Sequence, residues 1–266
     1  MYMDNQTQKQ GPTKLTENFR LFFHETGEIF KFSNQTLRAL FNKPFEWLEF
    51  KRLCFEFGWR TLPLISITAF IMGLVLTMQS RPVLAKIGAE SWLPGMVFVS
   101  MVREIGPVIT ALIFAGKVGS GIGAELSSMR VTEQIDAMEV SGIYPMKFLV
   151  STRVLATTLM VPFLVFYADA IALVGSYFGV VLYGNVSLKL FLWQAFDWMY
   201  FIDVFPATIK TFFFGYAIGI ISSYQGYFCN KGTQGVGRSA NSAVVLSSLV
   251  VFIIDLVAVQ ITDIIT

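Results

Sequence analysis

The chain has 266 residues, of which 54% are hydrophobic and only 14% charged, and its formal net charge is +2. A soluble domain carries about a quarter charged residues, so this composition excludes an ordinary soluble protein. The small net charge gives no reason to expect a nucleic-acid partner. Apolar runs of about 20 residues, enough to cross a hydrocarbon core of about 30 Å, recur along the chain. The composition therefore predicts an all-α integral membrane protein.

The predicted elements begin with a polar stretch, residues 1–14, for which we expect disorder. Residues 15–60 place aromatic and basic side chains at helical spacing, which favours an amphipathic helix lying in the membrane interface. A helix packed on the protein's own cytosolic surface is the alternative. Residues 61–266 are expected to form a five-helix membrane domain. Its spans are predicted at about 62–78, 92–118, 148–183, 206–227 and 243–265.

The third predicted span, 148–183, is too long for one upright crossing. It is either a single tilted helix, with a kink at Pro162, or a crossing followed by a re-entrant piece. Small residues spaced four apart predict close helix packing, most simply within the chain. These pairs are Gly119 and Gly123, Gly175 and Gly179, and Gly215 and Gly219.

Charge placement gives the orientation. With the N-terminus inside, about fifteen of the 20 lysines and arginines lie inside. The outside set is Arg81, Lys86, Lys189 and Lys210. The positive-inside rule then predicts a multi-pass protein with a cytoplasmic N-terminus and an outside C-terminus. The polar segment that follows the second span is therefore expected in the cytoplasm.

That polar segment, Thr132–Gly142, keeps a helical rhythm. Ser128 or Thr132 can cap its N-terminus, and Glu133 falls in the first turn. Gly142 and Pro145 then form a helix stop. An apolar stripe runs along it through Val131, Ile135 and Met138. Either this stripe inserts into a groove of a soluble partner, or the helix lies on the protein's own cytoplasmic surface.

Two adjacent charges, Arg103 and Glu104, fall inside the second predicted span. Each costs about 2.5–3.5 kcal/mol at bilayer depth by insertion scales, so such residues usually face a cavity or a partner. One interpretation is a lining for a substrate headgroup. The other is a structural ion pair between helices. Candidate partners for such a pair are Asp169, Lys210 and Asp255.

Catalytic chemistry is poorly supported by the sequence. GKVGSGIG lacks the order of glycine, lysine and hydroxyl residue that defines a P-loop. The only histidine is His24, outside every predicted span, so Ser120 has no base beside it. The sequence also lacks a metal-ligand cluster. We therefore expect a non-enzymatic membrane subunit with no catalytic residue, no metal and no cofactor bound by this chain.

The segment REIGPVITALIFAGKVGSGIGAELSSMRVTEQIDAMEVSGIYP closely resembles the signature of MlaE/YrbE-type permeases. These are the membrane subunits of ABC transporters that work with MCE proteins. The stretches NKGTQGVGRSANSAVVLSSL and FIIDLVAVQ support the resemblance, which runs from about Trp47 to the C-terminus.

The resemblance implies a homodimer of five-span subunits in the bacterial inner membrane, with a periplasmic C-terminus. An MlaF-type ATPase would bind ATP and Mg on the cytoplasmic side, and a hexameric MlaD-type MCE protein would stand in the periplasm. Whether an MlaB-type STAS protein joins the ATPase is left open. The implied substrate is phospholipid moved between the inner and outer membranes, which maintains outer-membrane lipid asymmetry. An ATP-independent secondary transporter and a structural membrane scaffold are the alternatives.

The resemblance also assigns roles to residues. The Arg–Glu pair of the family's lipid-cavity helix corresponds to Arg103 and Glu104. The family's coupling helix, which contacts the ATPase, corresponds to the segment Thr132–Gly142. Its assigned positions are Thr132, Glu133, Gln134, Asp136, Ala137, Met138 and Glu139.

Overall fold

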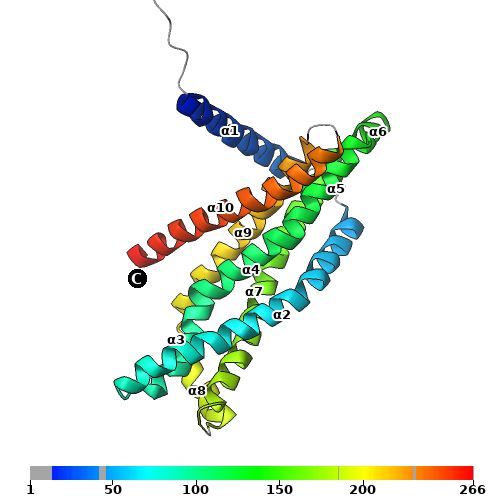
Figure 1. The fold of residues 1–266 in the computed structure, drawn as a ribbon. Helices are drawn as coiled ribbons and strands as arrows, with labels where there is room; N and C mark the ends of the chain where they lie inside the picture. The colour runs from blue at the N-terminus through cyan, green and yellow to red at the C-terminus, as the bar shows by residue number, and fades with distance from the viewer. Residues whose placement is uncertain (1–13, 42–45, 185, 230–231, 266) are drawn as a thin grey trace, which may run out of the picture.

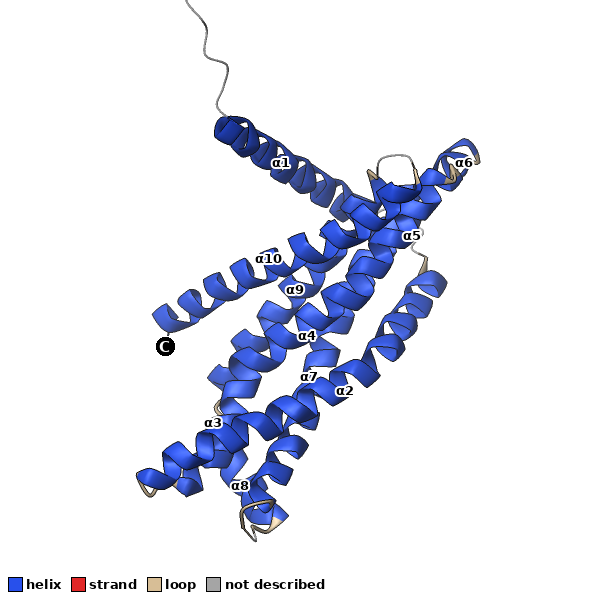
Figure 2. Cartoon of the chain, viewed as in Figure 1, coloured by secondary structure: helices blue, strands red, loops and turns tan. Residues whose placement is uncertain are grey.

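The computed structural model describes residues 14–41, 46–184, 186–229 and 232–265. Helices form all of the regular structure in these ranges (Figure 2). Five of them are long and apolar enough to cross a membrane, which confirms the predicted number of spans. They are Trp47–Lys86, Glu90–Val131, Met146–Val181, Phe201–Tyr227 and Thr233–Ile264. The disorder expected for residues 1–14 concerns a segment outside the described ranges, apart from Lys14.

Helix α1, Lys14–Phe41, projects from one end of the bundle and meets it near its own C-terminal half (Figure 1). Phe32, Thr36 and Ala39, spaced four and three apart, are buried against the bundle. Phe30, on another face, is 76% exposed. This alternation is the pattern of a helix with one packed face and one free face.

Helix α2, Trp47–Lys86, is continuous over 40 residues, about 60 Å at 1.5 Å per residue. The boundary that we expected between residues 60 and 61 therefore falls inside a helix. Pro63 removes only one backbone hydrogen bond, and packing against α7 continues on both sides of it. The aromatic and charged segment that begins at Trp47 is thus the first part of the first spanning helix.

The second span is a rod of successive helical pieces. It begins with a single 3₁₀ turn, Glu90–Trp92. Two π-helical turns interrupt the α-helix, and each one contains charged residues of the signature: Arg103 and Glu104 in one, Lys117 in the other. Pro107 has no N–H for an α-helical bond just after the first π turn, which favours the wider winding there. The pieces are α3 (Leu93–Ser100), η2 (Met101–Ile105), α4 (Gly106–Phe114), η3 (Ala115–Gly119) and α5 (Ser120–Val131).

The third span is a single long helix, so the re-entrant alternative is wrong. It begins with a π-helical segment, Met146–Ser151, and continues as α7, Thr152–Val181, with Pro162 inside it. A short helix, α8 (Leu188–Asp197), connects it to α9 (Phe201–Tyr227). The last helix is α10, Thr233–Ile265.

The core lies where α2, α4, α5, α7 and α9 meet (Figure 1). Phe114, Leu126, Val161, Phe214 and Ile218 are completely buried there. Glycines set the closest approaches. A Cβ atom on Gly175 would overlap the carbonyl of Phe70 in α2, and one on Gly215 would overlap that of Thr157 in α7. The glycine pairs thus serve packing within the chain, as predicted.

Candidate functional site

Arg103 and Glu104 lie in the π turn η2 and reach different partners on α9. Glu104 Oε2 accepts a hydrogen bond from Lys210 Nζ at 2.8 Å, and Arg103 Nε lies 2.8 Å from Asp203 Oδ1. Lys210 Nζ also donates to Asp255 Oδ1 of α10 at 2.9 Å. We refer to Arg103, Glu104, Asp203, Lys210 and Asp255 as the charged cluster. It joins three spanning helices.

The structure selects among the partners that the sequence left open. Lys210 and Asp255 belong to the charged cluster, whereas Asp169 does not. Asp169 lies in α7 against Gly106, and its Oδ1 has no hydrogen-bond partner among the described residues. Lys210, placed among the outside residues by charge counting, is only 4% exposed, inside the bundle. A lysine in such surroundings requires carboxylates around it, because an unpaired buried charge is strongly destabilising.

Asp203 was missed by the sequence analysis. Its Oδ2 accepts a hydrogen bond from the backbone N–H of Tyr200 at 3.0 Å, so it caps the start of α9 while its other oxygen binds Arg103. The spacing of three residues from cap to carboxylate is a sequence signal for this arrangement. That signal was obscured because the predicted span started at Pro206.

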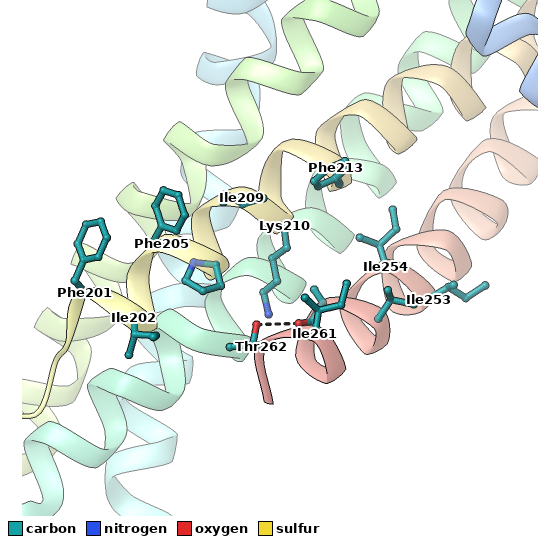
Figure 3. A pocket seen from close by; sticks show the side chains of 13 residues that line it. Phe201, Ile202, Phe205, Ile209, Lys210, Phe213, Ile253, Ile254, Ile261 and Thr262 are labelled. Atoms are coloured by element: carbon teal, nitrogen blue, oxygen red, sulfur yellow. Dashed lines mark hydrogen bonds between the residues drawn. The ribbon is translucent and has the colours of Figure 1, made fainter. Parts of the chain in front are cut away.

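Two adjoining cavities open beside the charged cluster. The larger, about 620 Å³, lies between α9 and α10 and is apolar except near Lys210 and Thr262 (Figure 3). The smaller, about 220 Å³, contains Arg103, Glu104, Asp203 and Asp263 in its wall. Both cavities share Lys210, Ile202, Pro206, Ala258 and Thr262. Together they form an amphipathic groove with a charged end and a long apolar end. A groove of this kind suits a ligand that has a polar head and an apolar tail.

At the opposite end of the rod, α5 turns into a short helix, α6 (Gln134–Val140), through a sharp corner. Glu133 has a φ of 60°, the left-handed region that non-glycine residues rarely adopt. The predicted helix over Thr132–Gly142 therefore starts two residues later than expected. The Thr132 hydroxyl donates to the carbonyl of Ser128 at 2.9 Å, so it closes the last turn of α5 and does not cap α6. Gly142, with a φ of 78°, ends the segment as predicted.

Helix α6 packs its apolar stripe onto its own protein. Ile135 is completely buried, and Met138 lies against the same core. Asp136 pairs with Arg130, and Glu139 accepts a hydrogen bond from the Tyr227 hydroxyl at 3.3 Å. Of the two interpretations of the stripe, packing on the protein's own surface is confirmed for Ile135.

The outward face of α6 and of the following turn is a different set of residues. Val140 is 91% exposed, and Ile143 and Tyr144 beside it are 46% and 61% exposed. Among the assigned positions of the expected coupling segment, Glu139 is exposed but bonded to Tyr227. The other exposed ones are Thr132, Glu133, Gln134 and Ala137. We refer to these four residues, together with Val140, Ile143 and Tyr144, as the corner surface. It combines apolar and polar side chains, and the sequence analysis did not single out Val140.

The fold and these sites define a polytopic helical membrane protein with paired charges inside its bundle. The family model described as permease MlaE matches residues 50–261. A probable ABC transporter permease protein of Rickettsia typhi is 36% identical over 232 residues, which are 87% of this chain and 90% of the relative. A probable ABC transporter permease protein of Synechocystis is 35% identical over 199 residues, 74% of each chain. The chain therefore belongs to the MlaE family of ABC transporter permeases, as the signature indicated.

A more distant relative comes from a plant. Protein TRIGALACTOSYLDIACYLGLYCEROL 1, chloroplastic, of Arabidopsis thaliana is 33% identical over 201 residues, which are 75% of this chain and 57% of the relative. Membership in a family of ABC transporter permeases implies that an ATPase subunit works with this chain.

Proposed function

We propose that this permease moves phospholipids between the inner and outer membranes of a bacterium, and thereby maintains outer-membrane lipid asymmetry. The amphipathic groove carries the proposal. Its apolar length between α9 and α10 fits acyl chains. The charged cluster at its end holds two cations and three carboxylates, which fits a headgroup that bears an amine as well as a phosphate. The name of the Arabidopsis relative includes the name of a diacylglycerol lipid, which supports a lipid as the substrate.

In this proposal the permease is a homodimer in the inner membrane, with a cytoplasmic N-terminus and a periplasmic C-terminus. An MlaF-type ATPase, which binds ATP and Mg, docks on the corner surface, and an MlaB-type STAS protein is a candidate accessory subunit. An MlaD-type MCE protein exchanges lipid on the periplasmic side. The chain itself hydrolyses no ATP. Its own contribution is to hold the lipid and to transmit movement.

Transmission follows from the continuity of the second span. ATPase movement displaces α6, and the rod from α5 back to η2 carries that displacement to Arg103 and Glu104. Because Glu104 binds Lys210 on α9, a shift of the rod changes the charged end of the groove. Such coupling drives transport only if the two positions of the rod differ in their affinity for lipid.

The lipid part of the proposal is tested by filling the groove. Ala258 lines both cavities, so Ala258→Phe is expected to abolish both phospholipid co-purification and ATP-driven lipid transfer in proteoliposomes, while the ATPase stays bound. Val174→Phe, a similar enlargement at a 46%-exposed site that lines neither cavity, is the control. Normal transfer by Ala258→Phe would contradict the groove as the lipid site. Transfer without nucleotide would instead identify a secondary transporter.

The docking part is tested at Val140. Val140→Asp places a charge on a side chain that is 91% exposed, so the fold is expected to be unaffected while ATPase co-purification falls about tenfold or more, as for a buried interface anchor. Ile87→Asp, at a side chain that is 70% exposed in the turn after α2, away from α6, is the control. Undiminished co-purification of Val140→Asp would place the ATPase elsewhere.

A further inference from the structure

Tyr227, the last residue of α9, lies where three helices meet. Its ring packs against two separate apolar clusters. One of these clusters includes Ile135 of α6, and the other includes Phe32 of α1. The Tyr227 side chain therefore packs within the apolar cluster of α6 and also within that of α1.

The contacts of Tyr227 toward the corner are polar as well as apolar. Its hydroxyl donates to Glu139 Oε1 of α6 at 3.3 Å, and the guanidinium carbon of Arg130 lies 5.9 Å from the centre of its ring. Arg130, at the end of α5, also pairs with Asp136 of α6. Both carboxylates of α6 are thus held by Tyr227 and by the cation stacked on it.

The contacts toward α1 are aromatic. The ring centres of Phe32 and Tyr227 are 6.0 Å apart, and the Phe32 ring also lies against the rings of Tyr224 and Phe228. One residue further along α1, the Ser33 hydroxyl is 2.6 Å from the hydroxyl of Tyr216, three turns down α9. Helix α1 is therefore attached to α9 at two levels, and α1 meets the bundle at the end that carries α6 (Figure 1).

Helix α9 carries Lys210 as well as Tyr227. The two residues are 17 positions apart, about 25 Å along the helix. The rod, for its part, carries Glu104 in η2 and leads into α6 at its other end. Helix α6 is thus connected to the charged cluster along two routes. One route runs through the rod to Glu104, and the other runs through Tyr227 and α9 to Lys210. The ion pair of Glu104 with Lys210 joins their far ends.

We propose that Tyr227 is the positioning residue through which α6 acts on α9 and α1. Gly226 of α9 lies against the backbone of Gly123 in α5, so α5 and α9 shift together at that contact. Tyr227 adds the contact by which a displacement of α6 itself reaches α9, and α1 then follows α9 through Phe32 and Ser33. The inference rests on the proposed function and deepens it. It names the side chain through which ATPase docking on the corner surface affects the lipid groove.

The test measures how much lipid is moved for each ATP hydrolysed, with the full complex in proteoliposomes of phosphatidylethanolamine and phosphatidylglycerol. Tyr227→Ala removes the ring and the hydroxyl, and is expected to lower lipid moved per ATP about tenfold while ATP hydrolysis changes less than about twofold. Tyr227→Phe keeps every ring contact and is expected to recover most of the ratio. A loss of ATPase binding alone would lower both rates together and leave the ratio unchanged.

Tyr183→Ala is the matched control, because Tyr183 also has a guanidinium over its ring, that of Arg81 at 4.5 Å, and it follows α7 at a site distant from α6. Its ratio is expected to equal that of the unmodified chain. An unchanged ratio in Tyr227→Ala, or an equal loss in Tyr183→Ala, would overturn the inference. If Tyr227→Ala fails to assemble, Tyr227→Leu against Tyr227→Phe tests the same ring contacts, and equal ratios in these two would overturn it. An unmodified complex that moves no lipid would refute the proposed function itself.

Discussion

The α2–α7 pair and the α9–α10 pair are held together by opposite kinds of contact. Along α2 and α7, glycines bring backbone against backbone: Gly73 faces the carbonyl of Ala172, and Gly175 faces that of Phe70. Between α9 and α10 the helices leave a groove of about 620 Å³, and an ion pair of Lys210 with Asp255 spans them.

This difference separates a rigid pair of helices from a pair that can move. We refer to α2 and α7 as the frame, and to α9 and α10 as the working part. Where backbones touch through glycine, dispersion contacts are dense and any sliding produces steric overlap, so α2 and α7 move as one body. Where long side chains and charges mediate the contact, the helices can shift while Lys210 exchanges partners. Conformational change in this permease is therefore expected in α10 and the rod, with α2 and α7 as the reference. Because Gly215 also brings α9 against the backbone of α7, α9 is expected to pivot at that contact and not to slide along α7.

The largest effect is expected at the charged cluster. Lys210→Met leaves Glu104 and Asp255 without their cation, and we expect the free energy of unfolding to fall by about 3 kcal/mol. Unfolding by sodium dodecyl sulfate in mixed micelles measures it. Adding Glu104→Gln and Asp255→Asn removes the uncompensated charge and is expected to restore most of the loss. Lys189→Met, at an exposed lysine of α8, is the control. A loss in Lys210→Met no larger than that of the control would mean that the cluster is not a structural link.

A medium effect is expected at the glycine contacts. Gly175→Ala forces a methyl group into the Phe70 carbonyl, so we expect a loss of about 2 kcal/mol in the same unfolding measurement. Gly121→Ala makes the same change where a Cβ atom meets nothing within 4 Å, and it is expected to stay within about 0.5 kcal/mol of the unmodified chain. Equal stabilities of the two variants would remove the distinction between frame and working part.

The smallest effect is expected from hydrogen bonds within the frame. Thr77 and Ser176 join α2 to α7 through hydroxyls 2.7 Å apart. Thr77→Val and Ser176→Ala are each expected to cost about 0.6 kcal/mol, and the double variant little more than either alone. A double-variant cycle in the unfolding measurement gives the coupling energy. A coupling above about 2 kcal/mol would show that hydrogen bonding, and not close backbone packing, holds the frame.

Much of this architecture could be predicted from the sequence. Long apolar runs separated by charged loops gave the number of spans, and the cost of charge at bilayer depth required partners for Arg103 and Glu104. Gly142 and Pro145 predicted the stop after α6. These inferences succeed because each depends on local composition or on a single strong energy term. The roles assigned to Arg103, Glu104 and the α6 residues by resemblance stay predictions.

What could not be predicted depends on long-range contacts or on small local changes. The partner of Arg103 is Asp203, 100 residues away, and only the packing of α9 on η2 brings them together. The start of α2 at Trp47 was hidden because a charged, aromatic first part has the same periodicity as an interfacial helix. The corner between α5 and α6 at Glu133 could not be predicted. Ile135 and Met138 have the spacing of a helix whether or not the chain turns at Glu133.

Glu133 itself has an evolutionary consequence. Holding a residue with a side chain in the left-handed region costs about 1–2 kcal/mol, a cost that glycine avoids. Random substitution toward glycine at this site would therefore stabilise the chain in isolation. A lineage that keeps glutamate here forgoes that gain, so deep mutational scanning is expected to separate the two pressures: Glu133→Gly should score well for abundance and poorly for growth that depends on the transporter.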